Sequence, residues 1–172
     1  DTIATSKILS ISEIGPVLGR AVSEWIANSG SKVLLERLGK IQVVLADLPG
    51  RQLAVTVGTT IWLDPYAAGY GWFIDPTPND DQEFLAVRVG GTLAAEVGEA
   101  SQRIDLLTAL LHEIGHGLGL KHATDNDAEN DLMSEFLSPG VRRLPSVTDV
   151  DAIFMDWRPL ADALDKRHPL MI

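Results

Sequence analysis

The residues of this chain with the clearest chemical potential lie close together in one short segment. Three of its four histidines, His112, His116 and His122, fall within eleven residues, and Glu113 lies among them. Because His112 and His116 are four residues apart, their imidazoles project from the same face of a helix. Two imidazoles placed in this way can hold one Zn²⁺ at Zn–N distances of about 2.0–2.1 Å. The segment therefore predicts a metal site on a helix.

The other residues of the segment favour a catalytic zinc over a structural one. Gly119 can adopt a positive φ, which lets the chain leave the helix and bring His122 back toward the metal as a third ligand. Three neutral imidazoles leave one coordination position open, as in catalytic sites. Glu113 projects beside the ligands, where it can take a proton from a zinc-bound water and later pass it to a leaving amine. Ordinary core or surface histidines are one alternative. A non-catalytic zinc site is another, but it would leave Glu113 without a role.

Composition excludes several other classes of protein. The chain has 172 residues, 45% of them hydrophobic, which suits one soluble domain. Its net charge of −10 argues against a nucleic-acid partner, since such binders need a basic face. It contains no cysteine, which excludes disulfides, thiolate ligands, a cysteine nucleophile and cysteine-based latency. No apolar run approaches the roughly 18–20 residues of a membrane span.

Hydrophobic periodicity predicts the elements that must position the histidines. A first helix is expected over 16–28, because Pro16 suits a first turn and is costly inside a helix. Ser10 and Glu13 form a competing start signal, a possible capping box. The other expected helices cover 103–118, which carries the histidines, and 148–157, with Thr148 as its N-cap. The expected strands cover 41–45, 53–57, 60–63, 84–89 and 92–97.

The histidine segment resembles the signature of the metzincin zinc endopeptidases, His-Glu-x-x-His-x-x-Gly-x-x-His. The resemblance implies an α+β, metzincin-like zincin fold: a twisted mixed sheet with two long helices above the cleft, and a small irregular lower subdomain ending in a helix. It also implies a single metalloprotease catalytic domain over 1–172. The upper subdomain would cover about 1–119, the lower subdomain about 120–158, and a tail 159–172.

Further residues bring the resemblance closer to the matrixin branch. Metzincins carry a methionine turn beneath the metal, and Met133, eleven residues after His122, fits that position. The serralysin and astacin branches have a tyrosine two residues later, where this chain has Glu135. Three segments are similar to matrixin-like domains of large secreted or surface proteins of bacteria: 46–50, 67–78 and 140–145. The resemblance thus implies a secreted or cell-surface bacterial protein, either a monomer or a domain of a larger protein.

By this resemblance, the reaction is hydrolysis of peptide bonds by a Glu113-assisted zinc-bound water. A protein or peptide substrate would bind in extended form along an edge strand, which we expect within 84–97. The specificity pocket would be lined by residues after His122 and Met133, namely Phe136, Leu137, Val141, Arg142 and Arg143. An arginine pointing into this pocket would favour acidic or polar side chains after the cut. The alternative is that both arginines pair with surface carboxylates.

Carboxylates offer a possible calcium site in addition to zinc. Ca²⁺ prefers hard oxygen ligands, and a glycine-rich loop supplies Asp64, Asp75, Asp80, Asp81 and Glu83. A second acidic group, next to the histidines, consists of Asp125, Asp127 and Asp131. Capping and solvated loop charges are the alternative for both. The second, structural zinc of matrixins is not expected, since no histidine precedes His112.

Two other functions remain open at this stage. The chain could be a non-catalytic zinc-containing binding or adhesive module of a large surface protein, although its intact Glu113 argues against this. It could also be a self-processing domain that cuts its own polypeptide. His168 is expected in a tail; the other interpretation has the tail folding into the cleft and blocking the zinc.

Overall fold

The computed structural model describes residues 7–27, 29, 31–124 and 130–155. A last helix covers 147–155. The other helices and strands, in chain order, are α1 (Ile11–Ala27), α2 (Lys32–Leu38), β1 (Gln42–Leu45), β2 (Ala54–Val57), β3 (Thr60–Leu63), β4 (Trp72–Phe73), β5 (Ala86–Val87), β6 (Leu93–Ala94), β7 (Ile104–Asp105), α3 (Leu106–Gly117) and β8 (Val141–Arg142).

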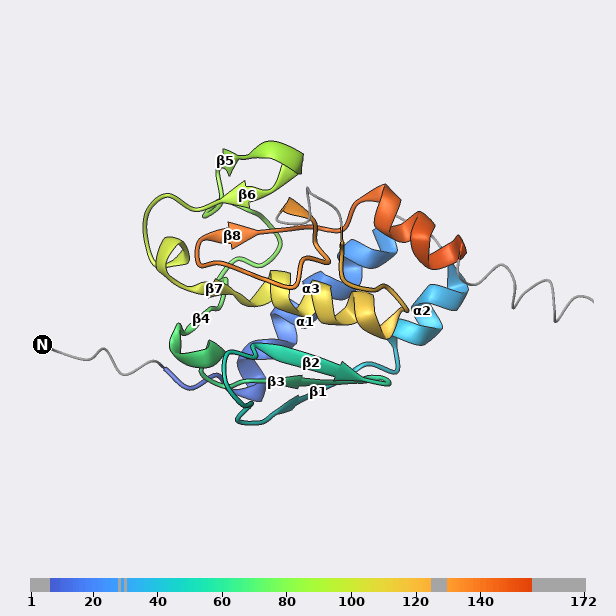
Figure 1. The fold of residues 1–172 in the computed structure, drawn as a ribbon, viewed down its shortest axis with the longest axis horizontal. Helices are drawn as coiled ribbons and strands as arrows, with labels where there is room; N and C mark the ends of the chain where they lie inside the picture. Colours follow the sequence, from blue (N-terminus) through green and yellow to red (C-terminus); the bar gives the residue numbers. More distant parts are fainter. Residues whose placement is uncertain (1–6, 28, 30, 125–129, 156–172) are drawn as a thin grey trace, which may run out of the picture.

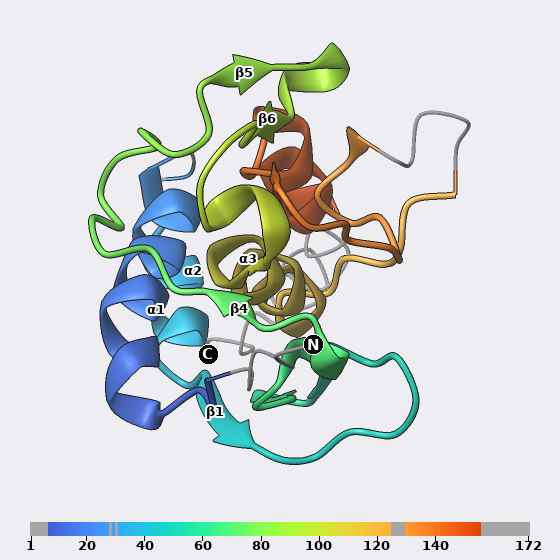
Figure 2. The same cartoon turned by 90° about the vertical axis from the view of Figure 1, so that its left-hand side faces the viewer.

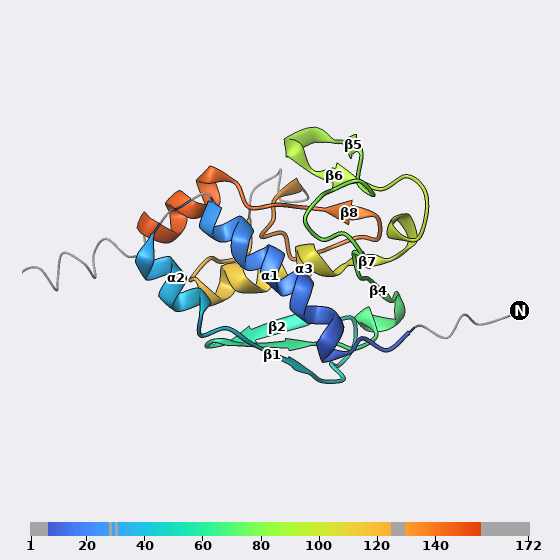
Figure 3. The ribbon, with the colours of Figure 1, turned by 180° about the vertical axis from the view of Figure 1, so that it is seen from behind.

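The main sheet is mixed and has the strand order β1-β3-β2. β1 runs parallel to β3, whereas β2 is antiparallel to it, so β2 lies at an edge. Helices α1 and α3 lie side by side over this sheet, as Figure 1 and the rear view in Figure 3 show. The expected α+β class, with a mixed sheet and two long helices, is confirmed.

Strands β5, β6 and β8 lie on the other side of α3 from the main sheet (Figure 1), and Figure 2 shows β5 and β6 on that side from a second direction. β5, β6 and β8 form one antiparallel group, and β4 pairs with β7 in parallel. The regular elements described after His122 are β8 and the last helix. None of the helices among the described residues is long and apolar enough to cross a membrane.

The core joins α1 to α3 through large apolar side chains. Trp25 is fully buried, and its indole N–H donates a hydrogen bond to the carbonyl oxygen of Leu111 at 3.3 Å. Ile61 and Leu63 point from β3 into this core, whereas Trp62 between them is partly exposed. This alternation is what a strand with one buried face requires. The packing holds α3, and with it the histidine segment, rigidly against the sheet.

The predicted start of the first helix is wrong: α1 begins at Ile11 and contains Pro16. Ser10 and Glu13 form the capping box, since Glu13 Oε2 accepts hydrogen bonds from both the backbone N–H and the hydroxyl of Ser10. Pro16 is exposed, and the Ser12 carbonyl that it leaves without a helical partner belongs to an exposed residue that water can reach. Gly15 before the proline has no Cβ to clash with its ring.

The other two helix starts also shift from the predicted positions. α3 begins at Leu106 because Asp105 is its N-cap and accepts from the Thr108 N–H at 3.1 Å. The last helix is capped by Ser146, whose hydroxyl accepts from the Asp149 N–H, and not by Thr148. Its expected end at 156–157 lies outside the described residues, and helix α2 was not predicted.

Candidate metal centre

The end of α3 brings the three histidines together. Gly119 adopts a φ of 106°, and the N–H of Leu120 donates to the carbonyl oxygen of Gly115 at 2.9 Å, which closes the helix and reverses the chain. As a result, Nε2 of His116 lies 3.0 Å from Nε2 of His112 and 3.0 Å from Nε2 of His122. Within the described part of the chain, these residues form the one group of three or more potential metal ligands.

Backbone carbonyls fix which nitrogen of each ring faces the centre. Nδ1 of His112 lies 2.9 Å from the carbonyl oxygen of Leu132, and Nδ1 of His116 lies 2.8 Å from that of Leu120. A carbonyl can only accept, so both Nδ1 atoms carry the proton and both Nε2 atoms present lone pairs. Lone pairs that face one another at 3.0 Å repel, and a metal cation bound between them would relieve that repulsion. Three imidazole nitrogens suit Zn²⁺, and the residues therefore fit a zinc ion.

Burial helps to keep the first ligand ready for a metal. It lowers the pKa of His112 to about 4, and the neighbouring His116 and His122 act in the same direction. The imidazole of His112 is therefore neutral at physiological pH, as metal binding requires.

Glu113 lies next to the histidines and is only 6% exposed. Burial raises its pKa, while the hydrogen bond from Thr56 opposes the rise. The Thr56 hydroxyl oxygen lies 2.7 Å from Oε2 of Glu113 and 2.9 Å from its carbonyl oxygen. A carboxyl group with a raised pKa beside a metal site has the properties of a general base and acid.

Met133 packs against α3 at Gly115, which precedes His116 in the sequence. It is 3% exposed, and a Cβ added to Gly115 would lie only 2.7 Å from its Sδ. The backbone N–H of Met133 donates to Oδ1 of Asp131, and its carbonyl oxygen accepts from the N–H of Ala123. The turn that carries Met133 is thus tied to the chain next to His122, where the expected methionine turn would lie.

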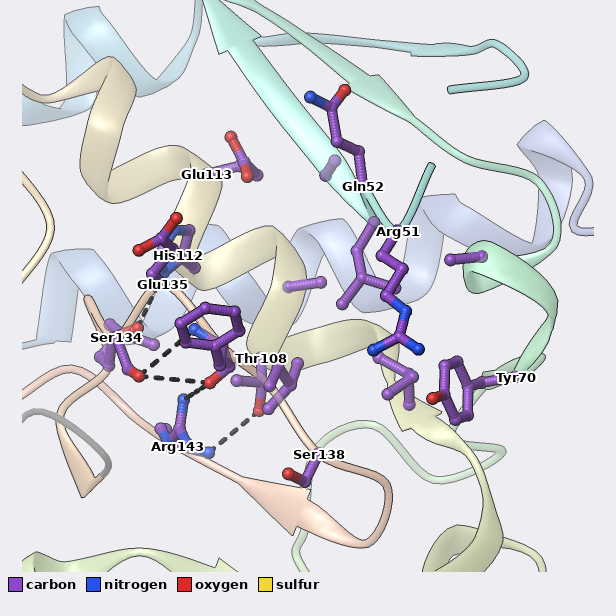
Figure 4. Close-up of a pocket in the computed structure, with 18 of the residues that line it drawn as sticks. Arg51, Gln52, Tyr70, Thr108, His112, Glu113, Ser134, Glu135, Ser138 and Arg143 are labelled. Carbon is purple, nitrogen blue, oxygen red and sulfur yellow. Dashed lines mark hydrogen bonds between the residues drawn. The ribbon is translucent and has the colours of Figure 1, made fainter. Parts of the chain in front are cut away.

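A pocket of about 580 Å³ opens beside the histidines. His112, Glu113 and His122 line it together with residues 51–55 on one side and 134–139 on the other. Figure 4 shows Arg51 and Tyr70 at one end, and Ser134, Glu135 and Arg143 at the other.

The structure corrects two expectations about this pocket. Phe136, Leu137 and Arg143 line it, but Val141 and Arg142 do not. The strand at its edge is β2, with Ala54 and Val55, whereas no residue of 84–97 contributes. The sequence could not show this, because an edge position depends on which strands pair.

Arg142 instead forms a buried ion-pair cluster at the start of α3. Its side chain is 0% exposed, and its guanidinium contacts Asp75 at 2.8 Å, Asp81 at 2.9 Å and Asp105 at 2.9 Å. The guanidinium also lies 4.1 Å above the ring of Phe84. Burial works against its charge, but the bonds to the carboxylates keep the pKa of Arg142 above its ordinary value.

The residues proposed for calcium do not share a site of their own. Asp64 accepts hydrogen bonds from the backbone N–H groups of Leu48, Tyr66 and Ala68, and Asp80 accepts from that of Gln82. Asp75 and Asp81 pair with Arg142, as described above. Glu83 places Oε2 in a buried position without a hydrogen bond. Asp131 binds the Met133 N–H, while Asp125, Asp127 and His168 lie outside the described residues.

Several residues at the site were not singled out from the sequence. Thr56 is a polar residue at an inward-facing position of a strand, and that pattern was the available signal. Thr108 accepts a hydrogen bond from the Arg143 N–H at 2.9 Å and so ties the pocket wall to α3. Arg51 and Tyr70 come from loops, where spacing gives no signal of orientation.

Comparison with known proteins agrees with the geometry. A search of curated proteins finds no match to the chain. The family model for matrixins, which are zinc metallopeptidases, matches residues 23–154, a range that includes the histidines, Glu113 and Met133. Since this match covers well over half of the sequence, the chain belongs to the matrixin family.

Proposed function

We propose that the protein is a zinc-dependent endopeptidase with Glu113 as its general base and acid. The observation that carries the proposal is the convergence of three imidazole Nε2 atoms beside a buried carboxyl group in an open pocket. His112, His116 and His122 would hold the metal. Zinc bound there would polarise a substrate carbonyl and make a water more acidic.

Glu113 would carry the proton in this reaction. Its carboxylate takes a proton from the attacking water as the new C–O bond forms at the scissile carbonyl. The same group then gives that proton to the amine nitrogen as the C–N bond breaks. Its buried position favours this role, because a pKa nearer to neutrality suits a group that must both accept and donate.

A peptide substrate would lie in extended form between β2 and residues 134–139. β2 is an edge strand whose backbone groups can pair with an added strand. Phe136, which is 76% exposed at the pocket, offers an apolar contact for a substrate side chain. We treat the chain as one catalytic domain, with a division near residue 119 at the end of the zinc-binding helix.

The test is cleavage of casein, and of the chain itself, by the purified protein with added Zn²⁺. We expect cleavage that a zinc chelator stops and that Glu113→Ala abolishes. Glu36→Ala, at an exposed position on α2, is the matched control and should cleave normally. Absence of any chelator-sensitive cleavage would refute the proposal.

The same assay separates the two other functions. Cleavage of the chain itself without cleavage of casein would identify a self-processing domain. Zinc binding without cleavage of either substrate would favour a non-catalytic binding module.

A further inference from the structure

Thr56 lies where the edge strand meets the zinc-binding helix. Along β2, Val55 and Val57 are exposed, while Ala54 and Thr56 face inward. Thr56 is thus a polar residue at an inward-facing position, which requires a hydrogen-bond partner. That partner is Glu113.

The two branches of the Thr56 side chain contact two residues on one face of α3. Its hydroxyl oxygen lies 2.7 Å from Oε2 of Glu113, and its methyl Cγ2 lies 3.8 Å from the place where Gly117 would carry a Cβ. Glu113 and Gly117 are four residues apart and therefore lie on the same face of the helix. Because χ1 of threonine is stiff, a methyl held over Gly117 also fixes the direction of the hydroxyl.

The hydroxyl also ties the Glu113 side chain to its own backbone. The same oxygen lies 2.9 Å from the Glu113 carbonyl oxygen, so one hydroxyl hydrogen serves two acceptors of one residue. This arrangement restricts the rotamers of Glu113, whose long side chain would otherwise lose considerable entropy on reaching one productive position.

We propose that Thr56 is a positioning residue that holds Oε2 of Glu113 against β2 and leaves Oε1 to exchange the proton with the attacking water and the leaving amine. This inference rests on the proposed endopeptidase function. It also links substrate seating to catalysis, because the strand that carries Thr56 lines the substrate pocket through Ala54 and Val55.

Two substitutions test the inference through the rate of peptide hydrolysis. Thr56→Val keeps the shape but removes the hydroxyl, and we expect kcat to fall about tenfold with little change in KM. Thr56→Ser keeps the hydroxyl and should recover most of the lost rate. Thr60→Val on β3 is the matched control and should behave as the wild type. An unchanged kcat in Thr56→Val, or a serine variant as slow as the valine variant, would overturn the inference.

A double-mutant cycle tests the contact without any activity. Urea unfolding of the metal-free wild type, Thr56→Val, Glu113→Ala and the double variant should show that Thr56→Val costs less stability once Glu113 is alanine. Zinc affinity of Thr56→Val should equal that of the wild type, because both hydrogen bonds of the Thr56 hydroxyl go to Glu113, which is not among the metal ligands. If the losses in unfolding free energy of the two single variants simply add in the double variant, or if Thr56→Val weakens zinc binding, the positioning role is contradicted.

The two proposals fail in different ways. A wild-type chain that cleaves nothing overturns the endopeptidase function and with it the catalytic reason for the contact. The unfolding cycle would still show whether Thr56 holds Glu113. A wild-type chain that cleaves casein together with an unimpaired Thr56→Val overturns the inference alone.

Discussion

Helix α3 has a cluster of polar groups at each end, and the two clusters are built in opposite ways. At its start, Asp105, Asp75 and Asp81 surround the guanidinium of Arg142. Near its end, the Nε2 atoms of His112 and His116 meet that of His122 from the following turn. The first cluster contains both signs of charge. The second brings together three imidazole nitrogens.

The difference indicates which of the two clusters is suited to bind a metal ion. A buried guanidinium surrounded by carboxylates satisfies its own hydrogen bonds and charge, and so it holds loops together without a ligand. Imidazole nitrogens that face one another with their lone pairs contain no opposite charge of their own, and a bound cation supplies it. Two of the acidic residues that suggested calcium, Asp75 and Asp81, thus pair with a cation of the chain itself, while the histidines suggest a bound zinc ion.

The largest expected effect on stability comes from replacing Arg142, the buried cation of the first cluster. Arg142→Met leaves buried carboxylates without a partner, and we expect a loss of about 3–5 kcal/mol in the free energy of unfolding. Urea unfolding of the metal-free protein measures it. Arg103→Met removes a partly exposed pair with Glu99 and should cost at most about 1 kcal/mol. Equal losses in the two variants would contradict the importance of the Arg142 cluster.

The second prediction concerns the stabilisation of the protein by zinc bound to the histidines. Zinc at one hundred times its dissociation constant should stabilise the wild type by about 2.7 kcal/mol. His116→Ala should lose this gain, because His116 lies between the other two ligands. Lys121→Ala, at an exposed neighbour, should keep it. Thermal unfolding with and without zinc is the measurement, and a zinc effect that survives in His116→Ala would place the metal elsewhere.

A third prediction concerns the close packing beneath the histidines. Gly115→Ala brings a Cβ to 2.7 Å from Sδ of Met133, and we expect it to cost about 1–3 kcal/mol despite the better helix propensity of alanine. Gly19→Ala on α1 has nothing within 4 Å and should stabilise the protein by up to about 1 kcal/mol. If Gly115→Ala lowers the free energy of unfolding and Gly19→Ala raises it, the close contact with Met133 is supported. A stabilising Gly115→Ala would show that Met133 moves aside without cost.

The smallest expected effect is that of calcium. Because Asp75 and Asp81 already pair with Arg142, and Asp64 and Asp80 accept hydrogen bonds from backbone N–H groups, adding Ca²⁺ or a calcium-selective chelator should leave the unfolding temperature of the zinc-loaded protein unchanged. Zinc added to the metal-free protein in the same assay serves as the positive control. A clear rise in the unfolding temperature on adding Ca²⁺ would show that acidic residues away from Arg142 form a calcium site.

Local spacing predicted the metal centre well, because the geometry of His112, His116 and His122 depends only on one helix and its end. Features set by distant partners could not be predicted in this way. Pro16 is tolerated within α1 because both its ring and the Ser12 residue whose carbonyl loses a helical partner are exposed. Arg142 is buried because β8 pairs with β6 and turns that side chain toward Asp105, a register that no local pattern reveals.

The carbonyl groups that orient the imidazoles have a consequence for how the centre can be altered by mutation. Leu132 and Leu120 hold the Nδ1 atoms through their backbone oxygens, which every amino acid possesses. Point substitutions at these two positions therefore leave the acceptors in place. A deletion or insertion of one residue in the turn 117–120 would instead move an acceptor away from its ring. The orientation of the ligands is thus robust to changes of residue type and sensitive to changes of chain length.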